Sequence, residues 1–195
     1  MMITLKRGRT CLTLWATVVL VCMPASARAD RYVSPFVGVN FGNSQGNGRA
    51  DFGAAAGWMG SGIAGVEVDL GYSPNFFGGS GALGDNNVLT IMGNLIVGIP
   101  GGGTYGPGIR PYGTLGLGLM RTDVSGRPTP GFVPRISDNN VGLNGGFGVM
   151  GFLSEHAGIR GDVRYFHDFR ETPPDTVQFG SFHFWRASLG VVLRP

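Results

Sequence analysis

Cysteine, lysine and charge are scarce in this chain of 195 residues, and each shortage excludes a class of protein. Both cysteines, Cys11 and Cys22, lie near the start, so the rest of the chain cannot form a disulfide. Only 14% of the residues are charged, against roughly 25% in soluble globular domains. The 36 glycines argue against a helical protein, because glycine weakens helix interiors. The hydrophobic fraction of 43% argues against disorder, so the composition permits a glycine-rich sheet protein.

The basic charge is concentrated at the start of the chain. Four basic residues lie within the first 29 positions: Lys6, Arg7, Arg9 and Arg28. The remainder has 11 arginines, no lysine and 12 acids, which gives 11 − 12 = −1. The pI near 9.2 therefore does not indicate a nucleic-acid partner, and we expect none.

The first 29 residues have the layout of a cleaved secretory signal peptide. A basic start precedes the apolar stretch Cys11–Met23, and Ala27-Arg28-Ala29 provides an Ala-x-Ala cleavage site before Asp30. This stretch is shorter than the roughly 20 residues of a membrane-spanning helix. We therefore predict an exported protein in which residues 1–29 are removed and residues 30–195 form one domain.

Eight segments with period-two alternation follow, separated by clusters of Gly, Pro, Asn, Asp and Ser. We predict strands near Tyr32–Phe41, Asp51–Met59, Ile63–Tyr72, Val88–Ile99, Arg110–Val124, Val141–Leu153, Gly158–Phe169 and Phe182–Leu193. In the seventh segment, charged residues occupy the even positions from Arg160 to Arg164, whereas Ile159, Val163 and Tyr165 occupy odd positions. Such alternation suits either a soluble sandwich with an apolar interior or a membrane barrel with an apolar exterior.

Glycine decides between these two architectures. The polar faces of the segments contain small residues such as Gly116, Gly118, Gly142 and Gly146, which suit a narrow interior where strands converge. Strands in lipid cannot leave backbone groups unpaired, so the sheet must close. We predict an all-β fold, an eight-stranded antiparallel transmembrane β-barrel with up-and-down meander topology.

The connections between segments indicate the orientation of the barrel. The predicted external loops are long: Gly42–Ala50, Ser73–Asn87, Ser125–Asn140 and Arg170–Ser181. Two of the opposite connections, Gly60–Gly62 and Ser154–Ala157, are tight, whereas the glycine-rich connection Pro100–Ile109 is longer than this arrangement predicts.

Three stretches carry a resemblance to a known family: Arg110–Leu119, Asn144–Phe152 and Gly158–Phe166. Their patterning resembles the small outer-membrane β-barrel family of Gram-negative bacteria, which includes the transmembrane domain of OmpA and the OmpX-like and opacity proteins. The resemblance implies location in the outer membrane, contact with its lipid and assembly by the barrel-assembly machinery. Members usually end in an aromatic residue, whereas this chain ends Leu193-Arg194-Pro195. We expect a monomer.

Six charged residues face the predicted lumen by parity: Glu67, Asp69, Arg160, Asp162, Arg164 and Arg186. Buried ions are costly unless they are paired, so we expect one network of acids and arginines. Because eight strands leave an interior filled by side chains, we interpret this network as a plug rather than an ion path.

Aromatic residues near the strand ends predict interfacial girdles. We place Phe41, Tyr72, Phe169 and Trp185 at the external level, and Tyr32, Trp58 and Tyr112 at the periplasmic level. Arginines in or near the external loops suit lipopolysaccharide phosphates: Arg49, Arg121, Arg127, Arg135 and Arg170.

The sequence indicates no catalytic, cofactor or metal site. The stretch Gly146–Gly151 matches a dinucleotide-binding pattern but lies inside a predicted strand, and the histidines are too scattered to ligate a metal. Ser181 and His183 resemble the Ser/His pair of outer-membrane lipid A deacylases, in the opposite order and without an orienting acid. Three functions stay open: a non-catalytic barrel that displays four loops for envelope integrity, adhesion or surface interaction; a small pore or transporter for apolar or small solutes; and a lipid A hydrolase.

Overall fold

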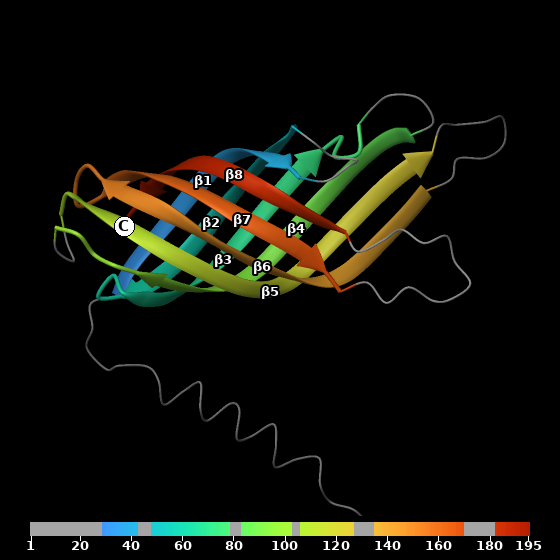
Figure 1. Cartoon of the computed structure of the whole chain (residues 1–195). Coiled ribbons are helices and arrows are strands. Elements are labelled where there is room, and N and C mark those ends of the chain that lie inside the picture. Colours follow the sequence, from blue (N-terminus) through green and yellow to red (C-terminus); the bar gives the residue numbers. More distant parts are fainter. Residues whose placement is uncertain (1–28, 43–47, 79–82, 103–105, 127–134, 170–181) are drawn as a thin grey trace, which may run out of the picture.

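Eight strands form one closed antiparallel barrel in the computed structural model, which describes residues 29–42, 48–78, 83–102, 106–126, 135–169 and 182–195 (Figure 1). Each strand pairs with the next along the chain, and the last strand pairs with the first. The predicted fold class is therefore confirmed. Of the predicted signal peptide, residues 1–28 lie outside the described residues, and Ala29 begins the first strand. No helix in the described ranges is long and apolar enough to cross a membrane.

The strands follow the predicted segments closely. Their bounds are β1 Ala29–Phe41, β2 Arg49–Gly60, β3 Ala64–Pro74, β4 Leu83–Gly98, β5 Gly108–Gly126, β6 Arg135–Phe152, β7 Ala157–Asp168 and β8 His183–Leu193. Three of the four predicted external loops are consequently shorter than expected, because β2, β4 and β6 begin earlier. The central parts of all four, residues 43–47, 79–82, 127–134 and 170–181, lie outside the described residues.

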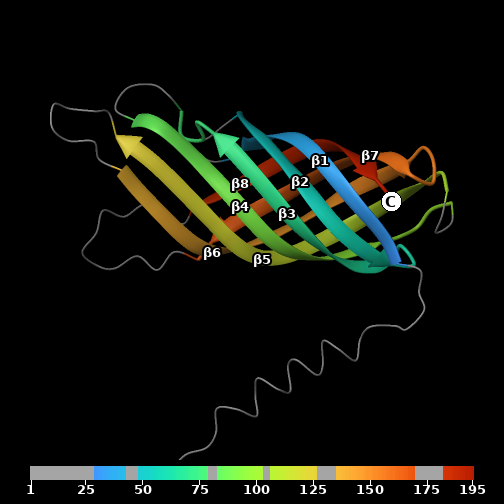
Figure 2. The same cartoon turned by 180° about the vertical axis from the view of Figure 1, so that it is seen from behind.

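The two ends of the barrel differ in their connections, and Figure 2 shows both ends from behind. Residues 61–63 and 153–156 make tight turns at the end where the C-terminus lies, and Ser61 and Gly62 adopt positive φ angles there. The glycine-rich connection at this end is shortened by a bridge in which Gly101 and Ile109 exchange backbone hydrogen bonds of 2.8 and 3.0 Å. In the outer-membrane orientation predicted from the sequence, short turns face the periplasm, so we call this the periplasmic end and the opposite one the external end.

The outer surface of the barrel is apolar. Leu115, Leu117 and Leu119 on β5 are 53–64% exposed, and outward residues of the other strands are aliphatic or aromatic in the same band. A continuous apolar belt of this kind is not a surface that a soluble monomer exposes to water. The belt therefore faces lipid, and the opposite side of each strand faces the lumen.

Glycines inside the barrel make room for large inward side chains. A Cβ atom at Gly146 would lie 2.9 Å from Cγ of Arg164, and one at Gly148 would lie 2.5 Å from the hydroxyl of Tyr112. The same relation holds for Gly71 and Arg186. The small residues on the polar faces are thus the packing complement of the lumen side chains.

Candidate functional site: a charged network inside the barrel

The lumen holds all six charged residues that the alternation assigned to it. Each side chain is buried, and Arg164 and Arg186 are at most 1% exposed. They come from three strands: Glu67 and Asp69 from β3, Arg160, Asp162 and Arg164 from β7, and Arg186 from β8. Because β3 and β7 lie on opposite sides of the barrel, their ion pairs cross the lumen.

Glu67 is the centre of the periplasmic half of this network. Its Oε2 lies 2.6 Å from a terminal nitrogen of Arg160, and its Oε1 lies 2.8 Å from a terminal nitrogen of Arg164. Asp162 lies between the same two arginines, 2.9 Å from Nε of Arg160 and 3.3 Å from Nε of Arg164. Two carboxylates and two guanidinium groups thus form one connected set of charge-assisted hydrogen bonds.

Arg186 extends the network toward the external end. One terminal nitrogen of Arg186 donates to both carboxylate oxygens of Asp69, at 2.7 and 2.8 Å. Asp69 also lies 3.5 Å from Arg164, so it links the two arginines. The planar guanidinium group can bond two carboxylates at once, and both arginines use this property.

Asp51 on β2 is a fourth carboxylate of the network that the sequence interpretation missed. It is buried, lies 3.5 Å from Arg186 and accepts a 2.5 Å hydrogen bond from the hydroxyl of Ser73. Asn40 in turn donates to Ser73 at 2.6 Å. Asp51 has the same parity as the buried residues Ala55 and Met59, so the alternation of β2 contains the signal that would have found it.

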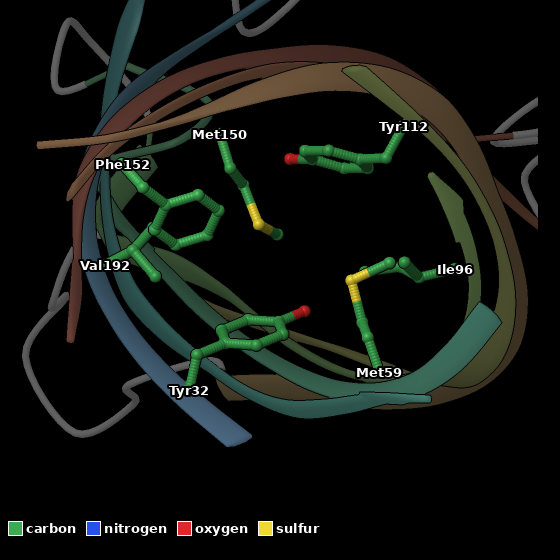
Figure 3. Close-up of a cluster of buried hydrophobic side chains, with 7 residues drawn as sticks. All are labelled: Tyr32, Met59, Ile96, Tyr112, Met150, Phe152 and Val192. Carbon is green, nitrogen blue, oxygen red and sulfur yellow. The ribbon is translucent and has the colours of Figure 1, made fainter. Parts of the chain in front are cut away.

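Tyr32 is a lumen residue, and its assignment to the periplasmic girdle is wrong. Its side chain is 2% exposed, and its hydroxyl donates to Glu67 at 2.6 Å. Tyr112 likewise lies inside the barrel and donates to Asp162 at 2.8 Å (Figure 3). Both residues lie near a strand end, as girdle residues do, but the alternation of β1 puts Tyr32 on the opposite face from the outward Val33.

The other aromatic residues assigned to the girdles lie on the outer surface. Trp58 is 36% exposed near the periplasmic end, and Tyr72 and Trp185 are 45% and 38% exposed toward the external end. Trp185 lies 5.1 Å from the ring of Tyr165 on the neighbouring strand.

Apolar clusters lie on both sides of the charged network. The periplasmic cluster, shown in Figure 3, contains Tyr32, Met59, Ile96, Tyr112, Met150, Phe152 and Val192. The external cluster contains Phe76, Val88, Met92, Met120, Phe166, Phe182 and Phe184, with Phe77 packed against it. Phe166 and Phe184 stack with their ring centres 4.9 Å apart. The charges are therefore enclosed between two apolar layers.

A second ion cluster joins the two ends of the barrel chain. Asp30 at the start of β1 lies 2.7 Å from Arg110 of β5 and 2.9 Å from Arg194, which follows β8. The guanidinium group of Arg194 lies 3.3 Å from the ring centre of Phe152. Arg194 thus places a buried cation across the seam where β1 and β8 pair.

Among the residues that the structure describes, those considered for catalysis and cofactor binding do not form a common site. Ser181 lies outside the described residues, and His183 is exposed at the start of β8. Gly146–Gly151 lies within β6, where a strand replaces the helix that a dinucleotide-binding motif requires.

A closed antiparallel barrel with an apolar exterior and a charged interior is an integral membrane β-barrel. Residues 13–194 match the model of the outer membrane protein beta-barrel domain family, and the chain belongs to this family. The resemblance drawn from the sequence is confirmed, and the family is located in the bacterial outer membrane. No curated protein matches the chain significantly.

Solved structures of small barrels are similar in fold. Neisserial surface protein A (NspA) is 18% identical, with a TM-score of 0.62 over 86% of this chain and 99% of that one. OprG from Pseudomonas aeruginosa is 17% identical, with a TM-score of 0.58 over 85% and 96%. Ail, the attachment invasion locus protein of Yersinia pestis, is 13% identical, with a TM-score of 0.54 over 86% and 98%. At these identities the likeness concerns the fold alone.

Proposed function

We propose that this protein is a non-catalytic, non-conducting barrel of the outer membrane that presents its four external connections at the cell surface. The observation that carries the proposal is the arrangement of the lumen. Ion pairs from β3 to β7 and β8 cross the interior, and apolar clusters cover them on both sides. An eight-stranded barrel filled in this way leaves no aqueous path for solutes.

Surface attachment is the role that the external end suits best. The pairing of β5 with β6 continues past the apolar belt to Ser125 and Arg135, so this hairpin stands above the lipid. One neighbour in fold, Ail, carries attachment and invasion in its name. Fold does not dictate function, so the proposal depends on the external residues of this chain.

The remaining partners belong to the same proposal. The chain is exported by a cleaved signal peptide, is inserted by the barrel-assembly machinery and works as a monomer. Arg121 is exposed toward the external end of β5, where its guanidinium group pairs with Asp123 at 2.9 Å. Asp123 takes two of the three nitrogens of this group, and the third can donate to a lipopolysaccharide phosphate.

Deletion and loop replacement test this function together. A deletion strain is compared with the parent for uptake of small solutes and for attachment to host-derived surfaces. Re-expression of the barrel with residues 127–134 and 170–181 replaced by Gly/Ser linkers is the matched control, because it keeps all described strands.

We expect attachment to fall in the deletion strain and to stay low with the replaced loops, with solute uptake unchanged in both. If solute uptake falls in the deletion strain and the loop-replaced barrel restores it, the result contradicts the proposal and supports a pore. If mass spectrometry shows more acyl chains on lipid A from the deletion strain than from the parent, the result contradicts the proposal and supports a hydrolase.

A further inference from the structure

The strands β2, β3 and β4 lie side by side in Figures 1 and 2, and the lipid-facing surface over them is hollowed. An open groove of about 550 Å³ lies here, and six outward residues line it: Ala56, Trp58, Val66, Val68, Gly93 and Leu95. Every one of these outward side chains is apolar over most of its surface, so the groove suits a hydrocarbon chain.

The register of the strands explains the groove. Trp58, Val66 and Leu95 form one cross-strand row, and Ala56, Val68 and Gly93 form the next row toward the external end. The second row is low because alanine and glycine occupy two of its three positions. A Cβ atom at Gly93 would meet only the carbonyl oxygen of Leu117 at 3.7 Å, so the space above Gly93 is open.

A cation lies at the periplasmic edge of the groove. Arg31 on β1 is directly opposite Trp58 in the register, and its side chain is exposed on the outer surface. No carboxylate in the described ranges forms an ion pair with Arg31. An arginine on the lipid side is stable only where its guanidinium group reaches the headgroup level. Arg31 and Trp58 therefore mark the periplasmic interface, where tryptophan is also favoured.

We propose that this surface binds one anionic glycerophospholipid of the periplasmic leaflet. Arg31 and the indole N–H of Trp58 donate hydrogen bonds to the phosphate, and one acyl chain occupies the groove over Ala56 and Gly93. The guanidinium group matches a phosphate in bidentate geometry. One lipid molecule can contact both Arg31 and the groove. Its phosphate and its acyl chains are joined at the headgroup level, where Arg31 and Trp58 lie.

A second copy of the chain is a poorer occupant. In a two-fold symmetric dimer the same patch meets itself, so the Arg31 side chains of both copies would approach each other near the contact. Two like charges brought together in a low-dielectric surface repel each other. A phosphate has the opposite sign, which favours the lipid.

Native mass spectrometry of the full mature protein tests the proposal. The protein is refolded into vesicles of phosphatidylethanolamine and phosphatidylglycerol, extracted in mild detergent, and compared with Arg31→Gln and Gly93→Leu. We expect one phospholipid to stay bound to the wild type, with phosphatidylglycerol enriched, and each variant to retain it at least tenfold less. Gly93→Leu fills the groove and leaves Arg31 in place, so the two variants test the chain and the phosphate separately.

Two control variants separate this site from general effects of substitution. Gly161→Leu makes the same change at another outward glycine with open space, and Glu155→Gln neutralises an exposed charge at the same end. Both are expected to retain the lipid as the wild type does, and a shift in gel mobility on heating shows that all variants are folded. Equal retention in all variants overturns the proposal. The proposal is also overturned if the wild type carries no phospholipid. It is overturned as well if the wild type is a dimer that Gly93→Leu disrupts while lipid retention is unchanged.

Discussion

Arg164 is the residue whose environment depends most on the network. Its side chain is fully buried and lies within 4 Å of Glu67, Asp69 and Asp162. Arg164→Ala removes a cation from among carboxylates that stay buried, and breaking a buried ion pair in this way costs about 3–5 kcal/mol. We expect the urea midpoint of the barrel in lipid vesicles, followed by tryptophan fluorescence, to fall accordingly.

Arg121→Ala is the matched control for that measurement. Arg121 forms an ion pair with Asp123 on the exposed part of β5, where solvent screens the charges. Its removal is expected to leave the unfolding midpoint unchanged. Equal effects of the two substitutions would contradict the assignment of the structural network to the lumen.

Tyr32→Phe tests the corrected position of that side chain. The substitution removes the hydroxyl that donates to Glu67, and a buried hydrogen bond to a charged group contributes about 1.5–3 kcal/mol. Tyr72→Phe is the control, because Tyr72 is exposed on the outer surface. The unfolding free energy should fall for Tyr32→Phe only; a girdle position for Tyr32 would make the two variants alike.

At the residue scale, alternation alone predicted the side of the strand for every lumen charge it was applied to. The errors arose where another argument replaced alternation. Tyr32 lies near the start of β1, a place that suggests an interfacial girdle, and Asp51 lies near the start of β2, where few alternating residues precede it. The ion pairs themselves could not be read from the sequence, because they join strands on opposite sides of the barrel, such as Glu67 and Arg160.

Within a single element, β6 carries adjacent glycines that face opposite sides. A Cβ atom at Gly146 would overlap the carbonyl of Val163 and lie 2.8 Å from Cα of Arg164, whereas one at Gly145 would meet Leu115 at an ordinary 3.5 Å. Overpacking a filled interior costs about 1–3 kcal/mol. Gly146→Ala should therefore lower the urea midpoint, and Gly145→Ala should leave it unchanged or raise it. The reverse order would contradict the orientation of β6.

Strand ends were harder to predict than strand centres, for a physical reason. Apolar and polar residues alternate only where one face of a strand contacts lipid. On β5 and β6 this alternation ends at Leu119 and Val141. Backbone pairing continues beyond that level through polar pairs such as Asp123 with Ser137. Pairing in water leaves no hydrophobic pattern, so β4 and β6 begin before the positions that the sequence indicated.

For the whole molecule, the layers of the lumen predict an electrically silent protein. Apolar clusters at both ends enclose the ion pairs, so the purified wild type should give no steady conductance in planar bilayers. Arg164→Ala should also stay silent if it remains folded, since one truncated side chain leaves both apolar clusters in place. Reproducible ion current from the wild type would show that the lumen is a path.

The direction in which the apolar side chains point is the claim on which the whole account depends, and lipid quenching measures it directly. Residues 30–195 contain no cysteine, so single cysteines at Leu117, Val163 and Ser137 of this segment can each carry a fluorophore. In vesicles of brominated lipid, the account predicts strong quenching at 117 and 163, which lie in the apolar belt, and little at 137, which lies beyond it. Unquenched labels at 117 and 163, in a protein that stays soluble without detergent, would contradict it.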